Sequence, residues 1–237
     1  MELLRKRAAQ LGLELTPDQL EQFSIYALEL AKWNRRMNLT AIERPEEVQL
    51  KHFLDSLTIA PILRERGLDS GRLVDVGSGA GFPGLPLKIA LPNLRLALVE
   101  ATGKKARFLE HIVATLGLKD VEVLCGRAEE LAHDPSLRER FDVAVSRAVA
   151  EMNALLELTL PFCRPGGIMV AQKKGDVAAE LTAAHRALET LGGRLLEVRE
   201  VRAEGLANGR VLALVEKAAP TPDKYPRRSG MPQKRPL

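Results

Sequence analysis

The chain has 237 residues, with 35 Lys and Arg against 31 Asp and Glu, and 46% of its residues are hydrophobic. This composition is typical of a globular protein and excludes a disordered chain. At this length no disulfide or metal is needed to stabilise the core, and the four histidines and two cysteines have no zinc-like spacing. The first ten residues lack an apolar signal core, and no uncharged stretch approaches the length of a membrane span. We therefore expect a cytoplasmic protein without bound metal or membrane contact.

Charge divides the chain into three segments. Residues 1–70 carry 10 basic and 11 acidic side chains, residues 71–217 carry 20 and 19, and residues 218–237 carry 5 and 1. The positive excess therefore lies in the last twenty residues. We interpret the segments as a helical N-terminal extension, an α/β domain and a basic tail. The tail contains five prolines, which predicts neither a helix nor a central strand there.

The N-terminal extension begins with a clear helix start. Thr16 can cap, Pro17 suits the first helical position and Gln19 completes a capping box. Apolar residues then recur at helical spacing to about Trp33, and Asn34 marks the start of a turn region. A further helix is expected over residues 47–63.

From residue 72 strands alternate with helices. Buried strands are expected over residues 72–76, 94–99, 121–124, 141–145 and 168–172, with helices over 87–91, 104–116, 151–162 and 177–191. Two closing strands, 194–201 and 210–216, resemble a hairpin around Asn208-Gly209, which makes the last strand antiparallel. This order predicts a doubly wound, mostly parallel seven-stranded sheet with helices on both faces. Cys125 and Cys163 have apolar neighbours, so both are expected to be buried, reduced thiols.

A glycine-rich turn follows the first strand. In the segment VDVGSGAGFPG, Gly77, Gly79 and Gly81 let the backbone turn sharply and let a ligand approach it. Glu100 ends the next strand, where a carboxylate can accept hydrogen bonds from ribose hydroxyls. The two features predict a nucleoside site at the carboxyl ends of adjacent strands.

The identity of the nucleoside needs further evidence. The string Gly79-x-Gly81-x-x-Gly84 matches the dinucleotide fingerprint, which leaves a NAD-linked oxidoreductase as an alternative. Phe82 and Pro83, however, occupy the turn where a pyrophosphate would need free amides. A cofactor with a cationic sulfonium would instead favour the nearby carboxylates.

This part of the chain resembles the class I S-adenosylmethionine-dependent methyltransferases. Two further segments match patterns of that class: Phe141-Asp142-Val143 at the start of the fourth strand and Pro165-Gly166-Gly167 before the fifth. Four segments narrow the resemblance: residues 74–87, Ser-Arg-Ala-Val-Ala at 146–150, Trp-Asn at 33–34 with Asn-Leu-Thr at 38–40, and His-Phe-Leu-Asp-Ser at 52–56. Together they are similar to the bacterial small-subunit ribosomal RNA guanine-N7 methyltransferases of the RsmG type, the glucose-inhibited division protein B family. This likeness spans nearly the whole chain.

The resemblance implies transfer of a methyl group from S-adenosylmethionine to N7 of one guanine in 16S ribosomal RNA. The partner is that RNA or the small subunit, and a monomer is expected. Naked RNA, an assembling particle and the finished subunit all stay open as substrates. The implied cofactor-binding residues are Gly77, Gly79, Phe82, Glu100, Ala101, Thr102, Ala128, Glu129 and Arg147.

Each implied residue has a role. Gly77 and Phe82 border the methionine end, Glu100 binds the ribose beside Ala101 and Thr102, and Ala128 and Glu129 flank the adenine. Arg147 lies at the mouth of the site as a candidate for positioning. The alternative interpretations are a solvated surface acid for Glu129 and an ion pair with a nearby acid for Arg147.

No catalytic base or nucleophile is evident. The chain has Ser-Arg-Ala-Val after the fourth strand, where amino-methylating enzymes carry an Asn/Asp-Pro-Pro-aromatic string, and neither cysteine fits a cytosine-C5 nucleophile. Guanine N7 has a free lone pair and carries no proton, so its methylation needs neither group.

Basic residues supply the candidate RNA contacts. Lys173 and Lys174 end the fifth strand, and Arg227, Arg228, Lys234 and Arg235 lie in the tail with Lys224 and Tyr225. Asn38, His52 and Asp55 are expected on the substrate side, with a capping Asn and a core His as alternatives. An RNA-binding protein with a vestigial cofactor site is the second alternative function.

Overall fold

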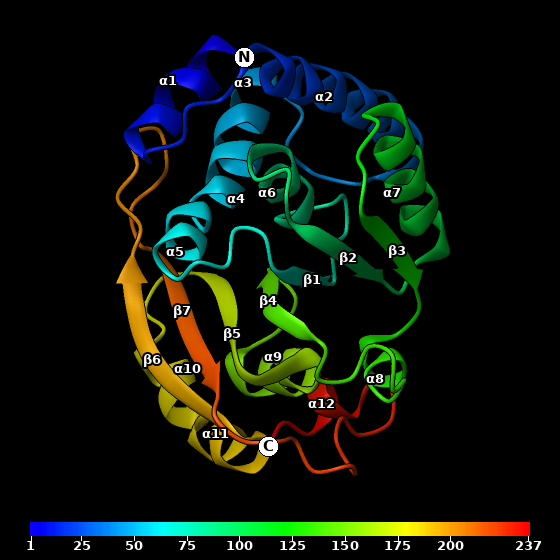
Figure 1. Cartoon of the computed structure of the whole chain (residues 1–237), viewed down its shortest axis with the longest axis vertical. Coiled ribbons are helices and arrows are strands. Elements are labelled where there is room, and N and C mark those ends of the chain that lie inside the picture. The colour runs from blue at the N-terminus through cyan, green and yellow to red at the C-terminus, as the bar shows by residue number, and fades with distance from the viewer.

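The computed structural model describes all 237 residues. A seven-stranded sheet lies between two layers of helices (Figure 1), in the order β3-β2-β1-β4-β5-β7-β6. The strands are β1 (Arg72–Val76), β2 (Arg95–Glu100), β3 (Val121–Cys125), β4 (Phe141–Arg147), β5 (Cys163–Lys174), β6 (Gly193–Glu200) and β7 (Arg210–Lys217). β1 to β5 run parallel, and β7 is antiparallel to both of its neighbours. The predicted doubly wound sheet and its closing hairpin are confirmed.

Two apolar cores separate the sheet from its helical layers. Leu73 and Val143 contribute to one core and Val74 and Ala144 to the other, because successive side chains of a strand point to opposite faces. The first face is covered by α1 (Glu2–Gln10), α2 (Pro17–Met37), α3 (Pro45–Glu47), the π-helix Val48–Leu54, α4 (Asp55–Leu57), α5 (Ala60–Glu65), α6 (Gly84–Ala90) and α7 (Gly103–Thr115). The second is covered by α8 (Ala128–Leu131), α9 (Met152–Thr159), the 3-10 turn Leu160–Phe162, α10 (Ala178–Ala183), α11 (His185–Leu191) and α12 (Met231–Lys234).

The N-terminal extension follows the predicted pattern with two differences. The capping box of Thr16 and Gln19 is formed. α2 continues to Met37 instead of ending near Trp33, because the Asn34 side chain is buried and binds the Thr40 amide and Glu43 from within the helix. The segment 47–63 is helical but is divided among four short elements. No helix is long and apolar enough to cross a membrane.

The prediction of a buried Cys125 was wrong, whereas Cys163 is buried as expected. Cys125 ends β3, which is an edge strand and has no buried side chain. β5 begins at Cys163, five residues before the predicted start, so the Pro165-Gly166-Gly167 segment belongs to the strand. A Cβ at Gly167 would lie 2.8 Å from the Asp142 carbonyl oxygen, so glycine is what allows β5 to approach β4.

The prediction that the tail contains no helix was also wrong. α12 forms one turn near its end, with Pro232 in the first turn, where a missing amide hydrogen costs nothing. The four-residue helix α8 was not predicted either, because a single turn has no apolar period to detect.

The N-terminal layer is bonded directly to the glycine-rich turn. The buried Tyr26 hydroxyl on α2 donates a hydrogen bond to the Ala80 carbonyl oxygen. We expect Tyr26→Phe to lower the free energy of unfolding by about 1–3 kcal/mol, because it leaves that buried carbonyl without a donor. Urea unfolding measures this effect. Tyr225→Phe is the matched control, since the Tyr225 hydroxyl makes no hydrogen bond. Equal stability of the two variants would contradict the prediction.

Candidate active site

The turn between β1 and α6 requires glycine. Gly77, Gly79 and Gly81 have φ of +76°, +58° and +96°, which side chains disfavour. A Cβ at Gly77 would lie only 2.6 Å from Val149 Cγ2. A Cβ at Gly79, by contrast, would meet nothing closer than the Gly77 carbonyl oxygen at 3.9 Å. The turn therefore leaves open space beside Gly79 for a ligand.

Two buried carboxylates hold this turn. Asp75 Oδ2 accepts a hydrogen bond from the Gly84 amide at 2.8 Å, whereas its Oδ1 is buried without a partner. Burial raises the pKa of Asp75 to about 7. Glu100, 6% exposed, accepts hydrogen bonds from the Gly79 amide (2.9 Å) and the Thr102 amide (2.8 Å). The turn is thus bonded to the ends of both β1 and β2.

The end of β3 lies next to the end of β2. The Gly126 amide donates to the Glu100 carbonyl oxygen at 3.1 Å, which joins the end of β3 to the end of β2. Ala101 and Thr102 are exposed, and Ala128 and Glu129 are buried on α8. Glu129 is 7% exposed and accepts a hydrogen bond from the Gly230 amide of the tail (2.8 Å), which excludes the solvated surface acid.

Aromatic contacts fix Phe82 beside the turn. The His52 ring stacks on Phe82 with centroids 4.4 Å apart and planes at 11°, and Tyr26 stacks on it at 5.5 Å and 19°. The Arg147 guanidinium carbon lies 4.9 Å from the centroid of the same ring. Phe82 therefore joins the glycine-rich turn to the N-terminal extension and to the end of β4.

Arg147 is held by an ion pair, as one of the two sequence interpretations expected. It contacts Asp55 Oδ2 at 3.0 Å, the Lys51 carbonyl oxygen at 3.1 Å and His52 Nδ1 at 3.2 Å. Asp55 Oδ1 lies 2.6 Å from Arg210 Nε in a second ion pair. The structure thus brings together the His-Phe-Leu-Asp-Ser and Ser-Arg-Ala-Val-Ala segments; Asn38 lies outside this network as the left-handed cap of α2.

His52 is neutral in this network. Arginine can only donate, so Nδ1 must accept, and Nε2 carries the proton that it donates to Thr40 Oγ1 at 2.7 Å. Burial and the Arg147 guanidinium lower the pKa of His52 to about 3. With both nitrogens bonded, the ring has no free lone pair with which to accept a proton.

A basic pocket of 390 Å³ lies beside this network, at the ends of β4 and β5 and the start of β7. Five of its lining residues are cationic (Lys51, Arg147, Lys173, Lys174 and Arg210), and Asp55 is its only carboxylate. Sequence reasoning missed Lys51 and Arg210. The hairpin register contained a signal for Arg210, because β7 is antiparallel to β5 and places it opposite Lys174.

The predicted RNA-contact residues separate into two groups. Lys173 pairs with Glu180 at 2.6 Å, and Arg227 pairs with the fully buried Glu157 at 2.6 Å. Lys174, Arg228, Lys234 and Arg235 are exposed and form no ion pair. No tail residue lines the basic pocket.

The strand order, the glycine-rich turn and the strand-end carboxylate define a class I S-adenosylmethionine-dependent methyltransferase. In fold, the chain is similar to a solved SAM-dependent methyltransferase from Aquifex aeolicus, with a TM-score of 0.54 and 20% identity over 76% of this chain and 96% of that one. The family model of rRNA small subunit methyltransferase G matches residues 19–208.

Curated relatives agree with this family match. A ribosomal RNA small subunit methyltransferase G of Dehalococcoides mccartyi (strain CBDB1) is 50% identical over 96% of this chain and 95% of its own length. Another, from Roseiflexus sp. (strain RS-1), is 48% identical over the full length of both chains. The chain belongs to the rRNA small subunit methyltransferase G family, which excludes the NAD-linked oxidoreductase.

The residues at the turn fit S-adenosylmethionine. Asp75 Oδ1 is a buried acceptor without a donor, and the Glu100 carboxylate, which binds the Gly79 amide, lies beside the open space at Gly79. Two acidic groups suit a ligand that carries an ammonium and a sulfonium.

Cofactor affinity is expected to depend on the ionisation of Asp75. Because the pKa of the folded-state carboxyl is about 7, binding of a cationic ligand below that pH must expel a proton. We expect affinity for S-adenosylmethionine to rise by nearly tenfold per pH unit from about pH 5.5 to 6.5 and to level off above about pH 7.5. Calorimetry at several pH values measures it. Asp75→Asn should flatten the profile, and a flat profile in the unaltered protein would contradict the assignment.

Proposed function

We propose that this protein transfers a methyl group from S-adenosylmethionine to N7 of a guanine in 16S ribosomal RNA. The observation that supports this choice is that both potential bases lining the basic pocket, His52 and Asp55, are already held by arginine. His52 is neutral and bonded at both nitrogens, and both Asp55 oxygens face arginines. A pocket whose His and Asp are both occupied suits an acceptor atom that has no proton to lose.

The cofactor-binding residues are those implied by the sequence. Gly77, Gly79 and Phe82 border the methionine end, with the free Asp75 oxygen facing its ammonium. Glu100, Ala101 and Thr102 hold the ribose, and Ala128 and Glu129 form the adenine end. When bound, the cofactor supplies a methyl group on a positively charged sulfur. Arg147 acts as a positioning residue. Its contacts with Phe82 and Asp55 fix the side chains that lie between the cofactor-binding residues and the basic pocket.

The basic pocket is the proposed place of the target nucleotide. Its cations suit a phosphate, and its position beside Phe82 and Arg147 adjoins the methionine end of the cofactor site. Asp55, the only carboxylate that lines this pocket, offsets part of the positive charge that develops on a guanine attacking through N7.

The three segments then have separate tasks. Residues 1–70 supply His52 and Asp55 to the substrate side, residues 71–217 hold the cofactor, and residues 218–237 add exposed cations for RNA. The chain is proposed to act as a monomer. The proposed partner is 16S ribosomal RNA or the small subunit, in the cytoplasm.

Replacement of the target guanine by 7-deazaguanine tests the acceptor atom. The analogue keeps the Watson–Crick edge and lacks the N7 lone pair, so we expect RNA binding to persist and methyl transfer to fall to background. Incorporation of labelled methyl under single-turnover conditions measures it, with guanine RNA as the control. The transfer rate at saturating cofactor should also show no obligatory deprotonation between about pH 6 and 9. Methylation of the analogue would disprove N7 as the acceptor.

Lys174 tests the basic pocket. It is exposed at the end of β5 and free of ion pairs, so we expect Lys174→Ala to weaken RNA binding and to lower the slope of log K against log salt by about 0.7–0.9 units. Lys119→Ala is the matched control, because Lys119 is an exposed lysine before β3, at the opposite edge of the sheet. Identical salt slopes in both variants would place the RNA elsewhere.

A further inference from the structure

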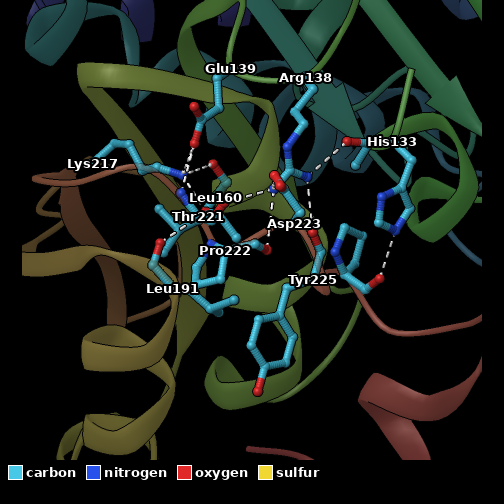
Figure 2. A network of polar contacts seen from close by, with 12 residues as sticks. His133, Arg138, Glu139, Leu160, Leu191, Lys217, Thr221, Pro222, Asp223 and Tyr225 are labelled. Atoms are coloured by element: carbon cyan, nitrogen blue, oxygen red, sulfur yellow. Dashed lines mark hydrogen bonds and ion pairs between the residues drawn. The ribbon is translucent and has the colours of Figure 1, made fainter. Parts of the chain in front are cut away.

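The C-terminal tail is anchored where it leaves β7. The fully buried Lys217 ammonium donates to the Leu160 carbonyl oxygen at 3.0 Å and to Thr221 Oγ1, and it pairs with Glu139 at 3.0 Å. Thr221 Oγ1 donates in turn to the Leu191 carbonyl oxygen (Figure 2). Each donor of this buried lysine therefore has an acceptor, which fixes the first residues of the tail.

A second anchor follows α8. The Arg138 guanidinium donates to the carbonyl oxygens of Thr221 (2.7 Å) and Tyr225 (2.9 Å), and His133 Nε2 lies 2.8 Å from the Pro226 carbonyl oxygen (Figure 2). The third anchor is Arg227, whose guanidinium and amide both bind the carboxylate of Glu157. These contacts carry the tail across the second face of the sheet to α8.

Before α12, the tail contacts the two acids of α8. The Ser229 hydroxyl donates to Glu130 Oε1 and the Gly230 amide to Glu129 Oε1, both at 2.8 Å. The bond from Gly230 is the only hydrogen bond that the Glu129 side chain makes. α8 has four residues, too few for a stable helix by itself, so its position depends on its neighbours.

We propose that the tail is a positioning element of the cofactor site: Ser229 and Gly230 hold α8 and Glu129 in the orientation that receives the adenine end. This inference rests on the proposed function, because it takes Glu129 as a residue of that site. It assigns the tail a task apart from RNA binding, and it explains why a segment rich in cations uses its backbone and Arg227 for contacts within the protein.

Truncation before Ser229 tests the proposal. A Ser229→stop variant retains all three anchors, including Arg227, whose loss would leave Glu157 buried and unpaired. We expect its affinity for S-adenosylhomocysteine to fall about tenfold, with little change in the folded fraction before ligand is added. Pro236→stop is the matched control, because it shortens the chain and keeps Gly230 and α12.

A double-mutant cycle distinguishes positioning of Glu129 by the tail from a general loss of order in the protein. If the tail acts through Glu129, Glu129→Ala and Ser229→stop should each cost about tenfold in affinity, and the combined variant should cost no more than either alone. Glu129→Gln in the full chain should retain affinity, because its amide oxygen can still accept the bond from Gly230. Losses that multiply, or a truncation that leaves affinity unchanged, would overturn the proposal.

A full-chain variant covers the case in which the truncated protein fails to fold. Gly230 has φ of +81° and open space at its Cβ, so Gly230→Ala strains the backbone without a clash. Gly117→Ala imposes the same kind of strain at φ +62°, also without a clash, in the loop after α7. We expect weaker binding only for Gly230→Ala, and equal affinities would overturn the proposal. Glu100→Ala distinguishes the two hypotheses, because unchanged affinity in that variant would contradict the cofactor site itself.

Discussion

The site depends on the bonding of backbone amides in the glycine-rich turn to carboxylates at the ends of β1 and β2. Asp75 binds the amide that begins α6, and Glu100 binds the Gly79 amide across the turn. A glycine-rich backbone has much conformational freedom to lose, and charge-assisted hydrogen bonds offset that loss. The Glu100 carboxylate that stabilises the turn therefore also lies beside the open space at Gly79.

Phe82 connects the glycine-rich turn to the N-terminal extension and to the end of β4. It belongs to the turn, yet its ring contacts Tyr26 and His52 from the N-terminal extension and Arg147 from β4. Arg147 in turn shares Asp55 with Arg210, so one buried carboxylate sets the position of two cations at the pocket wall. The extension therefore contributes directly to the site, which is why the fold cannot be separated into a catalytic core and a passive cap.

The tail shows how the same charges can serve two purposes. Arg227 and Lys217 satisfy buried acceptors inside the protein, whereas Arg228, Lys234 and Arg235 stay exposed. Net charge alone does not distinguish these tasks, because an arginine paired with Glu157 and an arginine free in solvent count equally. Whether an arginine stabilises the fold or stays free for RNA depends on its interaction partner. The partner of Arg227 is Glu157, which lies 70 residues away in the chain.

Local pattern determined much of this protein. The alternation of strands and helices, the capping box at Thr16 and the glycine turn with Glu100 each depend on neighbouring residues, and the structure has all of them. The boundary of α2 and the burial of Cys125 were predicted wrongly for one reason: the long-range bonds of Asn34 and the edge position of β3 cannot be read from adjacent residues.

The sequence by itself therefore determined the fold class and the glycine-rich turn, since both follow from short-range periodicity and backbone conformation. Tertiary structure alone decided what Arg147, His52, Arg227 and Glu129 contact. Their roles depend on hydrogen bonds between segments that are distant in the chain, and the strength of such bonds comes from burial that only the folded protein provides.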